Sequence, residues 1–373
     1  MVIGIDGNEA NVAQKVGVSI YAEQLLRYFQ KQANPKLGFI IYLRQKPLSH
    51  MPTENTFYKY RVIPGSFLWS QLFLPLDLFF RRKIDIFFTP AHYAPRFLPV
   101  PLVVTIHDLS YFYFPDEFLR NDLYKLINWT AYSVRKASQI IVVSKTTKKD
   151  LAEFYHLNDD HVRVIYNGFD KPINPPEQSP VLKSYHLQKE AYVLFVGTLQ
   201  PRKNLTTLID AFSRFYALYP HFKLVLTGKK GWLYDKIFFE IQHRGLEDHV
   251  VITGYLPNSE VAILYRNAFC FVFPSLYEGF GIPLLEAMSY GCPVISSHSA
   301  SLPEVGGDAC LYFDPKDSQD LLEDLIRLKS ESSLKTSLIK KGHERLKQFS
   351  WEKCAKETLE VLSNIPYDDK AHS

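Results

Sequence analysis

The sequence predicts two α/β domains in tandem, each a doubly wound parallel sheet with helices on both faces. Three observations carry this prediction. The chain has 373 residues, which is long for one hydrophobic core and suits two domains. Short apolar runs alternate with amphipathic helical patterns, as in parallel sheets whose strands are joined by helices. A proline-rich stretch at residues 171–180 separates the two halves and has the composition of a linker.

In the first half, six short apolar runs predict strands, at residues 2–6, 39–43, 84–88, 102–106, 139–143 and 162–165. The first helix is predicted from an i, i+3, i+4 rhythm carried by Val18, Tyr21, Ala22, Leu25, Leu26 and Phe29. The run 67–80 is strongly apolar, and Arg81, Arg82 and Lys83 follow it. We favour a core helix there, because the run is apolar on most faces. The alternative is a surface that rests on an anionic membrane.

In the second half, six further runs predict strands, at residues 192–196, 223–226, 250–253, 270–273, 293–296 and 310–313. Helical patterns lie between them, at residues 204–219, 258–266 and 318–328. Ligands of doubly wound sheets bind beyond the carboxyl ends of the strands. With two such domains we expect the site in the cleft between them. The expected boundaries are an N-terminal domain at 1–170, a linker at 171–190, a C-terminal domain at 191–350 and a final helix within 351–373.

Composition excludes several classes of protein. Hydrophobic residues make up 46% and charged residues 22%, as in ordinary globular domains. The net charge of +4 and the lack of a long Lys/Arg run give no indication of nucleic-acid binding. The four cysteines form no C-x-x-C pair and are expected to be reduced and structural. Residues 1–6 lead directly into a strand, so we expect no signal peptide, and no run of ~20 apolar residues predicts a membrane span.

The most informative motif lies at residues 273–288. It places Glu278 and Glu286 eight positions apart, with Gly279-Phe280-Gly281 between them and Pro283 where a helix should begin. The glycines let the loop backbone approach a ligand, and the N–H groups of a helix start suit a phosphate. A carboxylate can accept two hydroxyl hydrogen bonds, as a ribose or hexose would offer. The motif therefore predicts a site for a phosphorylated sugar compound.

This run resembles the E-x7-E signature of family 4 of the retaining glycosyltransferases, also called glycosyl transferases group 1. The resemblance continues at residues 291–296, 301–309 and 312–315, which look like the next blocks of the family. Two glutamates at this spacing also occur on solvated helices, but the ordered series is specific. The resemblance implies the GT-B fold, with two Rossmann-like domains that face a central cleft. It implies acceptor binding on the first domain, nucleotide-sugar binding on the second, and a last helix that packs back on the first.

Arg202 and Lys203 follow the first strand of the second half, where a helix starts. Cations are unfavourable at that end of the helix dipole unless an anion is bound. A diphosphate leaving group gains charge as the sugar bond breaks, so cations there stabilise the transition state. The resemblance assigns both residues to the donor diphosphate. The alternative is a solvated helix start.

The resemblance also implies roles for residues of the second domain. Glu286 would bind the nucleotide ribose, and Glu278 would lie close to the transferred sugar. Substrate contacts are expected from the loop residues Gly279, Phe280, Gly281 and Ile282, with the N–H groups of Phe280 and Gly281 facing the sugar or diphosphate. Leu256, in the Thr253–Leu256 segment after a strand, matches the position beside the base. A plain strand-to-loop turn explains that segment nearly as well.

In the first domain, His107 comes at the carboxyl end of a predicted strand, and Asp108 follows it. The resemblance places the histidine near the donor sugar, where it would bond a hydroxyl, and makes Asp108 a substrate-binding residue. Each has a structural alternative, and that of Asp108 is to cap a loop. Gly17 lies in the family's glycine loop, but related members often carry two glycines and an Arg. The sequence Gly17-Val18-Ser19 therefore leaves a phosphate contact in doubt.

These observations lead to one prediction and two alternatives. The chain is expected to be a retaining glycosyltransferase that moves a hexose, of mannose or glucose type, from a nucleotide diphosphate sugar to a glycan or lipid-linked acceptor. The candidate catalytic residues are His107, Arg202, Lys203 and Glu278. The donor is a co-substrate, so no cofactor is expected. Without an Asp-x-Asp pair or a His/Cys cluster, metal independence is expected too.

The expected role is cell-surface polysaccharide synthesis in the cytoplasm, with a peripheral contact at the inner face of the plasma membrane left open. A nucleotide-sugar 2-epimerase shares the two-domain fold, but the E-x7-E block argues against it. A non-catalytic nucleotide-sugar-binding module is the other alternative. The complete set of two cations and two glutamates argues against that loss of activity.

Overall fold

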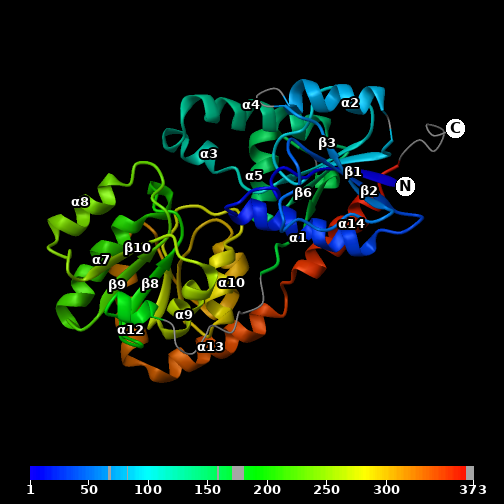
Figure 1. Ribbon diagram of the computed structural model, residues 1–373. Helices are drawn as coiled ribbons and strands as arrows, with labels where there is room; N and C mark the ends of the chain where they lie inside the picture. The colour runs from blue at the N-terminus through cyan, green and yellow to red at the C-terminus, as the bar shows by residue number, and fades with distance from the viewer. Residues whose placement is uncertain (66–68, 82, 158, 170–179, 367–373) are drawn as a thin grey trace. The chain divides into compact units, whose positions relative to one another are not determined.

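The computed structural model describes residues 1–65, 69–81, 83–157, 159–169 and 180–366. The chain divides into two compact units. The N-terminal unit comprises Met1–Gly168 with Phe349–Ser373, and the C-terminal unit comprises Phe169–Gln348. Each unit is a parallel sheet flanked by helices (Figure 1), which confirms the predicted fold class of two Rossmann-like α/β domains. Part of the predicted linker at 171–190 lies outside the described residues, and its later part carries the short helix α6 (Val181–Ser184).

The sheet of the N-terminal unit has the strand order β3-β2-β1-β4-β5-β6-β7, and every pair is parallel. Its strands are β1 (Val2–Asp6), β2 (Gly38–Leu43), β3 (Tyr58–Val62), β4 (Ile86–Thr89), β5 (Leu102–Ile106), β6 (Gln139–Val142) and β7 (Val162–Val164). Strand order reverses direction between β1 and β4, which is the switch point of this sheet.

The structure adds one strand that the sequence did not predict. β3 lies at the edge of the sheet and pairs only with β2. Four of its five residues are partly or fully exposed, and its sequence YKYRV carries two cations. The continuous apolar run that marks a central parallel strand is therefore missing, because only one face and one edge of β3 are covered.

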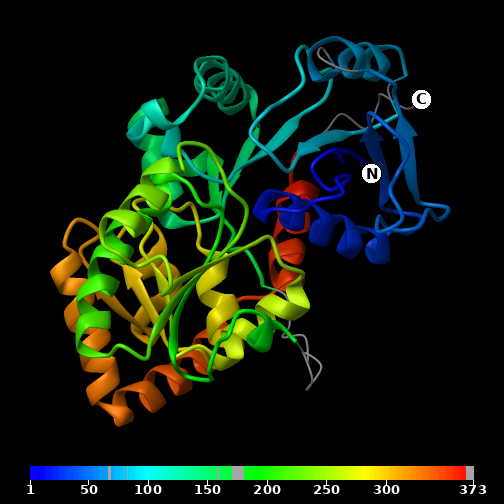
Figure 2. The ribbon, with the colours of Figure 1, turned by 60° about the vertical axis from the view of Figure 1, so that its left-hand side comes forward.

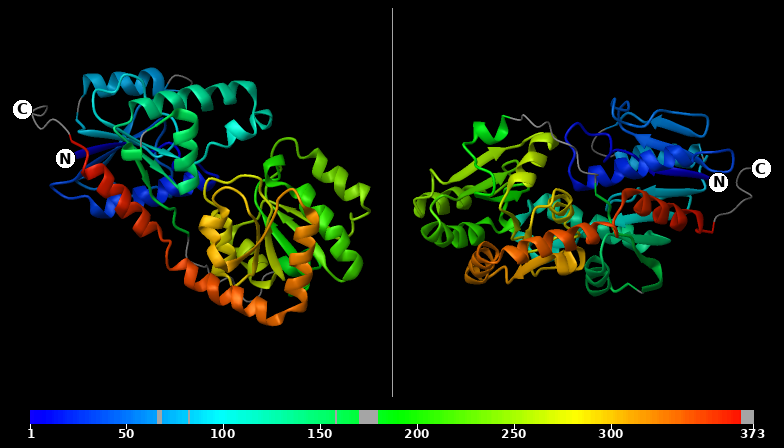
Figure 3. Two further views of the ribbon diagram at one scale, coloured as in Figure 1. Left: turned by 180° about the vertical axis from the view of Figure 1, so that it is seen from behind. Right: turned by 90° about the horizontal axis from the view of Figure 1, so that it is seen from below.

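Helices cover the N-terminal unit and include the last helix of the chain. They are α1 (Gly17–Gln32), η1 (Trp69–Phe73), α2 (Leu74–Phe80), α3 (Ser110–Tyr113), η2 (Pro115–Glu117), α4 (Arg120–Lys136), α5 (Lys145–Tyr155), η3 (Asp159–His161) and α14 (Trp351–Ser363). α14 packs along α1 (Figure 3), and the rings of Tyr21 and Trp351 meet edge to face at 6.4 Å. A Cβ on Gly168 would lie 2.1 Å from the Trp351 backbone nitrogen, so only glycine permits this approach.

The sheet of the C-terminal unit has the order β10-β9-β8-β11-β12-β13, again all parallel. Its strands are β8 (Tyr192–Val196), β9 (Lys223–Thr227), β10 (Val250–Gly254), β11 (Cys270–Phe273), β12 (Val294–Ser297) and β13 (Cys310–Phe313). All twelve predicted strands are present, with ends within two residues of the prediction. Here the order reverses between β8 and β11, which is the switch point where doubly wound sheets bind nucleotides.

The helices of the C-terminal unit are α6, η4 (Pro201–Lys203), α7 (Leu205–Leu218), α8 (Asp235–His243), α9 (Asn258–Asn267), α10 (Ile282–Ser289), α11 (Leu302–Gly306), η5 (Gly307–Ala309), α12 (Ser318–Ser330) and α13 (Ser332–Leu346). All four cysteines are buried and form no disulfide, as expected for structural thiols. Among the described residues, no helix combines the length and the apolar character needed to cross a bilayer.

The preference for a core helix at 67–80 is only half right. Within the described part, Trp69, Leu74 and Leu78 are fully buried in a cluster with residues of β2 and β4. Phe79 and Phe80, however, are 68% and 76% exposed. The run is apolar on two faces, and only one of them meets the sheet, because a helix at the edge of a sheet has a single buried side.

Candidate active site

The loops after β8 and β11 meet at the switch point of the C-terminal sheet. The first loop ends in the short turn η4, which carries Arg202 and Lys203 before α7 begins. The second loop carries Glu278 and leads into α10. The Leu276 N–H donates to the Arg202 carbonyl at 2.9 Å, so the two loops are joined by their backbones. Residues 75 positions apart in sequence are therefore held together.

An ion cluster forms where the loops meet. Lys203 Nζ lies 2.5 Å from Glu278 Oε1, and Arg202 Nη1 lies 3.6 Å from Glu278 Oε2. Arg202 also donates to the Tyr277 carbonyl at 2.6 Å. The three charged side chains are only 12–14% exposed. The alternative of a solvated helix start is therefore wrong, because both cations are largely buried against a carboxylate.

The electrostatics of the cluster favour an additional anion. Burial alone would raise the pKa of Glu278, but the nearby Lys203 and Arg202 charges outweigh burial and lower the pKa below its usual value. Glu278 is thus a carboxylate at neutral pH and cannot serve as a general acid there. Two cations facing one carboxylate leave a net positive charge at the loop. Such a site suits the two phosphates of a nucleotide diphosphate.

Asn204 holds the cationic turn in place and was missed by the sequence analysis. It adopts a left-handed conformation, with φ of 54°, between η4 and α7. Its Nδ2 donates to the carbonyl oxygens of Pro274 and Pro315, at 3.2 and 2.7 Å, and its Oδ1 accepts from Thr207. One amide thereby ties the loops after β8, β11 and β13 together. An asparagine directly before a predicted helix could have indicated this role, since asparagine adopts the left-handed conformation more readily than most residues.

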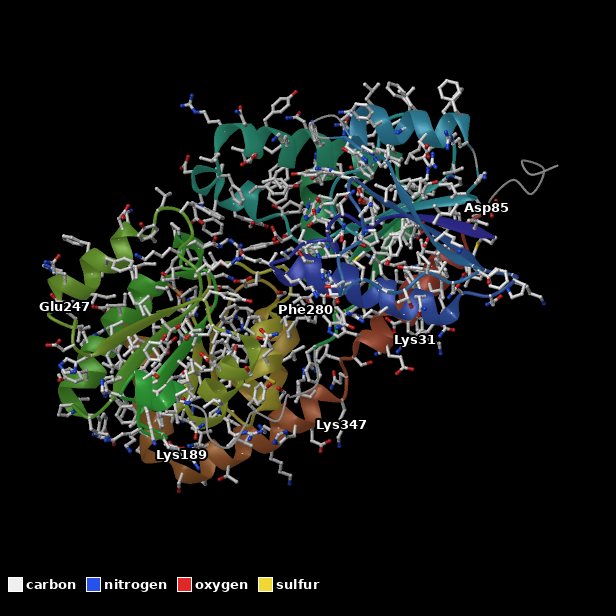
Figure 4. The ribbon with its side chains drawn as sticks, in the orientation of Figure 1. Lys31, Asp85, Lys189, Glu247, Phe280 and Lys347 are labelled. Carbon is white, nitrogen blue, oxygen red and sulfur yellow. The ribbon has the colours of Figure 1, made fainter. Side chains whose placement is uncertain are left out.

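The glycine loop before α10 is fixed by its own packing. Gly281 has φ of 105°, and an added Cβ would lie 2.7 Å from Leu302 Cδ2, so glycine is required. The Ser301 hydroxyl contacts the carbonyl oxygens of both Glu278 and Phe280, at 2.8 and 2.9 Å. Phe280, labelled in Figure 4, is 4% exposed, so its ring is packed in the protein. Any ligand contact from Phe280 would come from its backbone.

Helix α10 begins at Ile282, one residue before the expected start at Pro283, which lies in its first turn. Gly279 lies buried in the loop before it. Glu286 follows one turn into the helix and is half-buried. The Tyr265 hydroxyl donates to Glu286 Oε2 at 3.4 Å, and the Tyr265 ring is fully buried on α9. Tyr265 therefore orients Glu286, a role that no spacing in the sequence indicated.

The predicted base-binding segment lies at the end of β10. Leu256 is half-buried between β10 and α9. Tyr255 beside it is exposed, and Lys229 Nζ lies 5.2 Å from the centre of its ring. The Gly254 carbonyl accepts from the Gly228 N–H at 2.9 Å, which joins the ends of β9 and β10. These contacts describe an ordered turn after the edge strand of the sheet and leave the role of Leu256 a prediction.

In the N-terminal unit, His107 lies at the end of β5 and is 7% exposed. Its Nε2 lies 2.8 Å from the Pro90 carbonyl, which can only accept, so Nε2 carries the proton. The Nδ1 lone pair is then the acceptor that the ring can offer. Burial, with a smaller effect of His92, lowers the pKa of His107 to about 4. His107 is therefore neutral at physiological pH.

His92 is a second residue that sequence analysis missed. It follows β4, and its Nε2 accepts the backbone N–H of His107 at 3.3 Å. The proton of the neutral His92 ring is then on Nδ1. Among the described residues, that atom is buried and has no hydrogen-bond partner. The only signal in the sequence was a histidine shortly after a predicted strand of the first domain, to which acceptor binding was assigned.

Asp108 and Gly17 were predicted to contact substrate, and the structure describes their surroundings within the protein. Asp108 Oδ1 accepts from the Ser110 N–H and hydroxyl, at 3.0 and 2.7 Å, so it caps the turn that starts α3. Gly17 is exposed at the first position of α1, and an added Cβ would meet nothing within 4 Å. A cation, Lys15, does precede Gly17 in the sequence. It forms an ion pair with the buried carboxylate of Glu23. Substrate contacts by Asp108 and Gly17 stay predictions.

Among the residues that the structure describes, no group of three His, Cys, Asp or Glu side chains is placed to hold a metal ion. The positive charge at the site comes instead from Arg202 and Lys203.

The two units match two family models. Residues 182–345 match the model of glycosyl transferases group 1, and residues 17–171 match glycosyltransferase family 4. The chain is 34% identical to the O-antigen chain mannosyltransferase B of Escherichia coli over 286 residues, which is 74% of each chain. It is 30% identical to the O-antigen chain mannosyltransferase RfbU of Salmonella typhimurium over 221 residues, or 58% of this chain and 57% of the relative.

The fold is shared with solved structures of low sequence identity. WaaG, a glycosyltransferase involved in lipopolysaccharide biosynthesis, superposes with a TM-score of 0.73 at 14% identity, over 98% of this chain and 100% of that chain. Anabaena HepE, in complex with UDP and glucose, superposes with a TM-score of 0.76 over 98% of this chain and 99% of that chain. The two sequences are 18% identical, so this likeness concerns the fold.

Proposed function

The chain belongs to glycosyltransferase family 4 and has the GT-B fold, and from this we propose the reaction that it catalyses. It transfers a hexose from a nucleotide diphosphate sugar to a hydroxyl of a glycan or lipid-linked acceptor. The transfer retains the configuration of the sugar and needs no metal ion. The observation that carries the proposal is the buried cluster of Arg202, Lys203 and Glu278 at the switch point of the C-terminal sheet.

The cationic pair is proposed to bind the donor diphosphate. When the bond from the sugar to the diphosphate breaks, the leaving oxygen gains negative charge, and cations already held in place stabilise it without reorganisation. Arg202 can bind phosphate oxygens through its planar fork, while Lys203 acts as a point charge. The carboxylate of Glu278 keeps both cations in place before the donor arrives and then steers the sugar.

The remaining donor contacts follow from the same loops. Glu286, oriented by Tyr265, is proposed to accept hydrogen bonds from the ribose hydroxyls. The N–H groups of Phe280 and Gly281, next to the start of α10, would face the sugar or the diphosphate. The turn containing Leu256 would lie beside the base.

In the N-terminal unit, His107 is proposed to accept a hydrogen bond from a sugar hydroxyl on Nδ1. Its proton is held on Nε2 by Pro90, so the ring presents an acceptor rather than a charge. His92 is proposed to be a positioning residue that fixes the backbone at His107. The acceptor is proposed to bind this unit, with specificity set by the 91–99 and 110–118 loops.

Retention is proposed to follow a front-face route. The bond between the anomeric carbon and the leaving phosphate oxygen breaks, and the acceptor oxygen bonds to that carbon on the same face. The departing diphosphate takes the acceptor proton, so no protein base is needed. The lowered pKa of Glu278 supports this route, since an ionised, cation-paired carboxylate is a weak base.

Mannose is the favoured donor sugar, since the Escherichia coli and Salmonella typhimurium relatives are named as O-antigen chain mannosyltransferases, with glucose as the alternative. Cell-surface polysaccharide synthesis at the inner face of the membrane is the proposed role, and the cytoplasm is the proposed location.

The test is a thermal-shift screen of GDP, UDP, ADP and their sugar conjugates with EDTA present, followed by turnover of the best donor with glycan acceptors. Stabilisation by one nucleotide series and acceptor-dependent release of its diphosphate support the proposal. If no nucleotide stabilises the protein, the donor site is wrong. Conversion of the donor without acceptor would instead support the epimerase.

A further inference from the structure

The exposed side of η1 and α2 is a continuous apolar stripe. Five side chains form it, and we call them the α2 stripe: Leu72, Phe73, Leu76, Phe79 and Phe80. Their spacing of i, i+1, i+4, i+7 and i+8 places them on one face of a helix. Each is more than two-fifths exposed, and the two phenylalanines at the end are the most exposed. Monomeric proteins rarely leave so many large apolar side chains together in water, so the stripe marks an interaction surface.

The opposite side of the same helix is firmly anchored. Trp69, Leu74 and Leu78 are at most 1% exposed, and the Trp69 indole donates to the Ile63 carbonyl at 2.8 Å. Figures 1 and 2 show α2 at the outer edge of its unit, with no described element of that unit over its outer side. The stripe is therefore presented on a rigid element and does not depend on a loose segment.

The charges around the stripe are positive. Asp77 is the only acidic residue of η1 and α2, and it is paired with Arg61 at 2.6 Å and is 13% exposed. Arg81 and Lys83 follow the stripe directly, and both are exposed. Apolar side chains bordered by cations match the surface of a bilayer that contains anionic lipids, where acyl chains lie below negative headgroups.

A sixth apolar side chain is held close to η1. Phe97 is 84% exposed and has a left-handed backbone with φ of 54°. The next residue back, Arg96, donates from its N–H to the Ser70 carbonyl at 3.3 Å and from Nε to Gln71 Oε1 at 2.9 Å. The Arg96 guanidinium also lies 4.0 Å from the centre of the Tyr132 ring. An unfavourable backbone that keeps a phenylalanine in water is best explained by a partner for that ring.

We propose that the α2 stripe, together with Phe97, docks the N-terminal unit on an anionic lipid bilayer. The phenylalanine and leucine side chains enter the interfacial region, and Arg81 and Lys83 bind the negative headgroups. The inference rests on the proposed function only in that a lipid-linked acceptor would be carried by the same bilayer. A protein partner is less well supported, because short helices with apolar faces and flanking cations fit a headgroup layer without needing a complementary groove.

The test is co-sedimentation of the full chain with phosphatidylcholine vesicles, with and without phosphatidylglycerol. We expect binding to the anionic vesicles that weakens at high ionic strength. The double variant Phe79→Ser, Phe80→Ser should bind at least about tenfold less. Phe239→Ser on α8, which also replaces an exposed phenylalanine, serves as the control and should bind like the wild type. Because all three side chains are exposed, thermal unfolding should stay unchanged.

Three outcomes would overturn the proposal. These are no binding of the wild type to anionic vesicles, equal binding by the double variant, or a dimer in solution that the double variant abolishes. The last would make a second copy the occupant of the stripe. Nucleotide-induced thermal shift of the double variant separates this test from the donor site. If vesicle binding is found but no nucleotide stabilises the protein, the docking surface stands and the proposed function fails.

Discussion

Lys203 and Glu278 form an ion pair with Nζ and Oε1 2.5 Å apart, although 75 positions separate them in the sequence. Both side chains are almost nine-tenths buried, and Arg202 lies on the second carboxylate oxygen. A pair withdrawn from water to this degree costs desolvation energy and is weak evidence for a stabilising role. Since the pair lies at the switch point, we propose instead that the cations are held in place to bind an anionic ligand.

Replacing Lys203 should damage turnover far more than folding. In Lys203→Ala, Arg202 still neutralises Glu278, so the thermal midpoint should fall only slightly. The leaving diphosphate loses a point charge, and kcat should fall by about a hundredfold to a thousandfold. Lys341→Ala provides the control, because Lys341 pairs with an exposed carboxylate away from the switch point. Near-normal kcat in Lys203→Ala would remove the residue from the proposed machinery.

The lowered pKa of Glu278 predicts an acid-dependent loss of stability. A carboxyl group with a depressed folded-state pKa contributes stability above its unfolded value of 4.5, and that contribution is lost as pH falls through the folded value. Denaturant unfolding of the wild type and of Glu278→Gln should therefore differ more at pH 6 than at pH 3, pH values chosen to be about 1.5 units on either side of the unfolded value. A difference that is the same at both pH values would contradict the ionised, cation-paired Glu278.

Two glycines of the predicted site should respond in opposite ways to alanine. Gly281→Ala places a Cβ 2.7 Å from Leu302 in a left-handed backbone and should cost about 1–3 kcal/mol of unfolding free energy. Gly17→Ala meets nothing within 4 Å in a helix and should be neutral or stabilising by about 0.5–1 kcal/mol. Denaturant unfolding measures both. Any loss of donor affinity in Gly17→Ala would then report a ligand contact, since the fold is unaffected.

The contact between His92 and His107 should appear in kinetics. His92→Ala leaves the His107 N–H without its acceptor and should lower kcat/KM by about tenfold. His92→Gln can still accept through its amide oxygen and should recover most of the activity. The effects of His92→Ala and His107→Ala should not add in the double variant, because one residue acts through the other. Additive losses would mean that His92 has an independent role.

The central strands were predictable because each is buried on both faces and carries a continuous apolar run. β3 was not, because an edge strand needs no such run, and its YKYRV sequence also suits a loop. The prediction of a buried core helix at 67–80 was only half right for a related reason. A helix that is apolar on several faces is fully buried only where other elements pack against each of those faces. α2 lies at an edge of its unit, so one apolar face packs on the sheet and another stays exposed.

The residues of the proposed donor site could be predicted from sequence motifs, but the contacts that hold them in place could not. Arg202, Lys203, Glu278 and Glu286 could be named from motifs in the sequence, and the family resemblance implied their roles. Their supports could not. Asn204, Tyr265 and Ser301 act through contacts with residues that are distant in sequence, and no periodicity or spacing encodes such contacts.

The measurement that tests the central claim most directly is titration calorimetry of GDP and UDP with EDTA present, on the wild type, Lys203→Ala and Lys341→Ala. If the cluster binds a diphosphate without a metal ion, one nucleotide should bind the wild type and Lys341→Ala equally, and bind Lys203→Ala at least about tenfold more weakly. Equal affinity for Lys203→Ala, or binding of either nucleotide only when a divalent metal is supplied, would contradict the account.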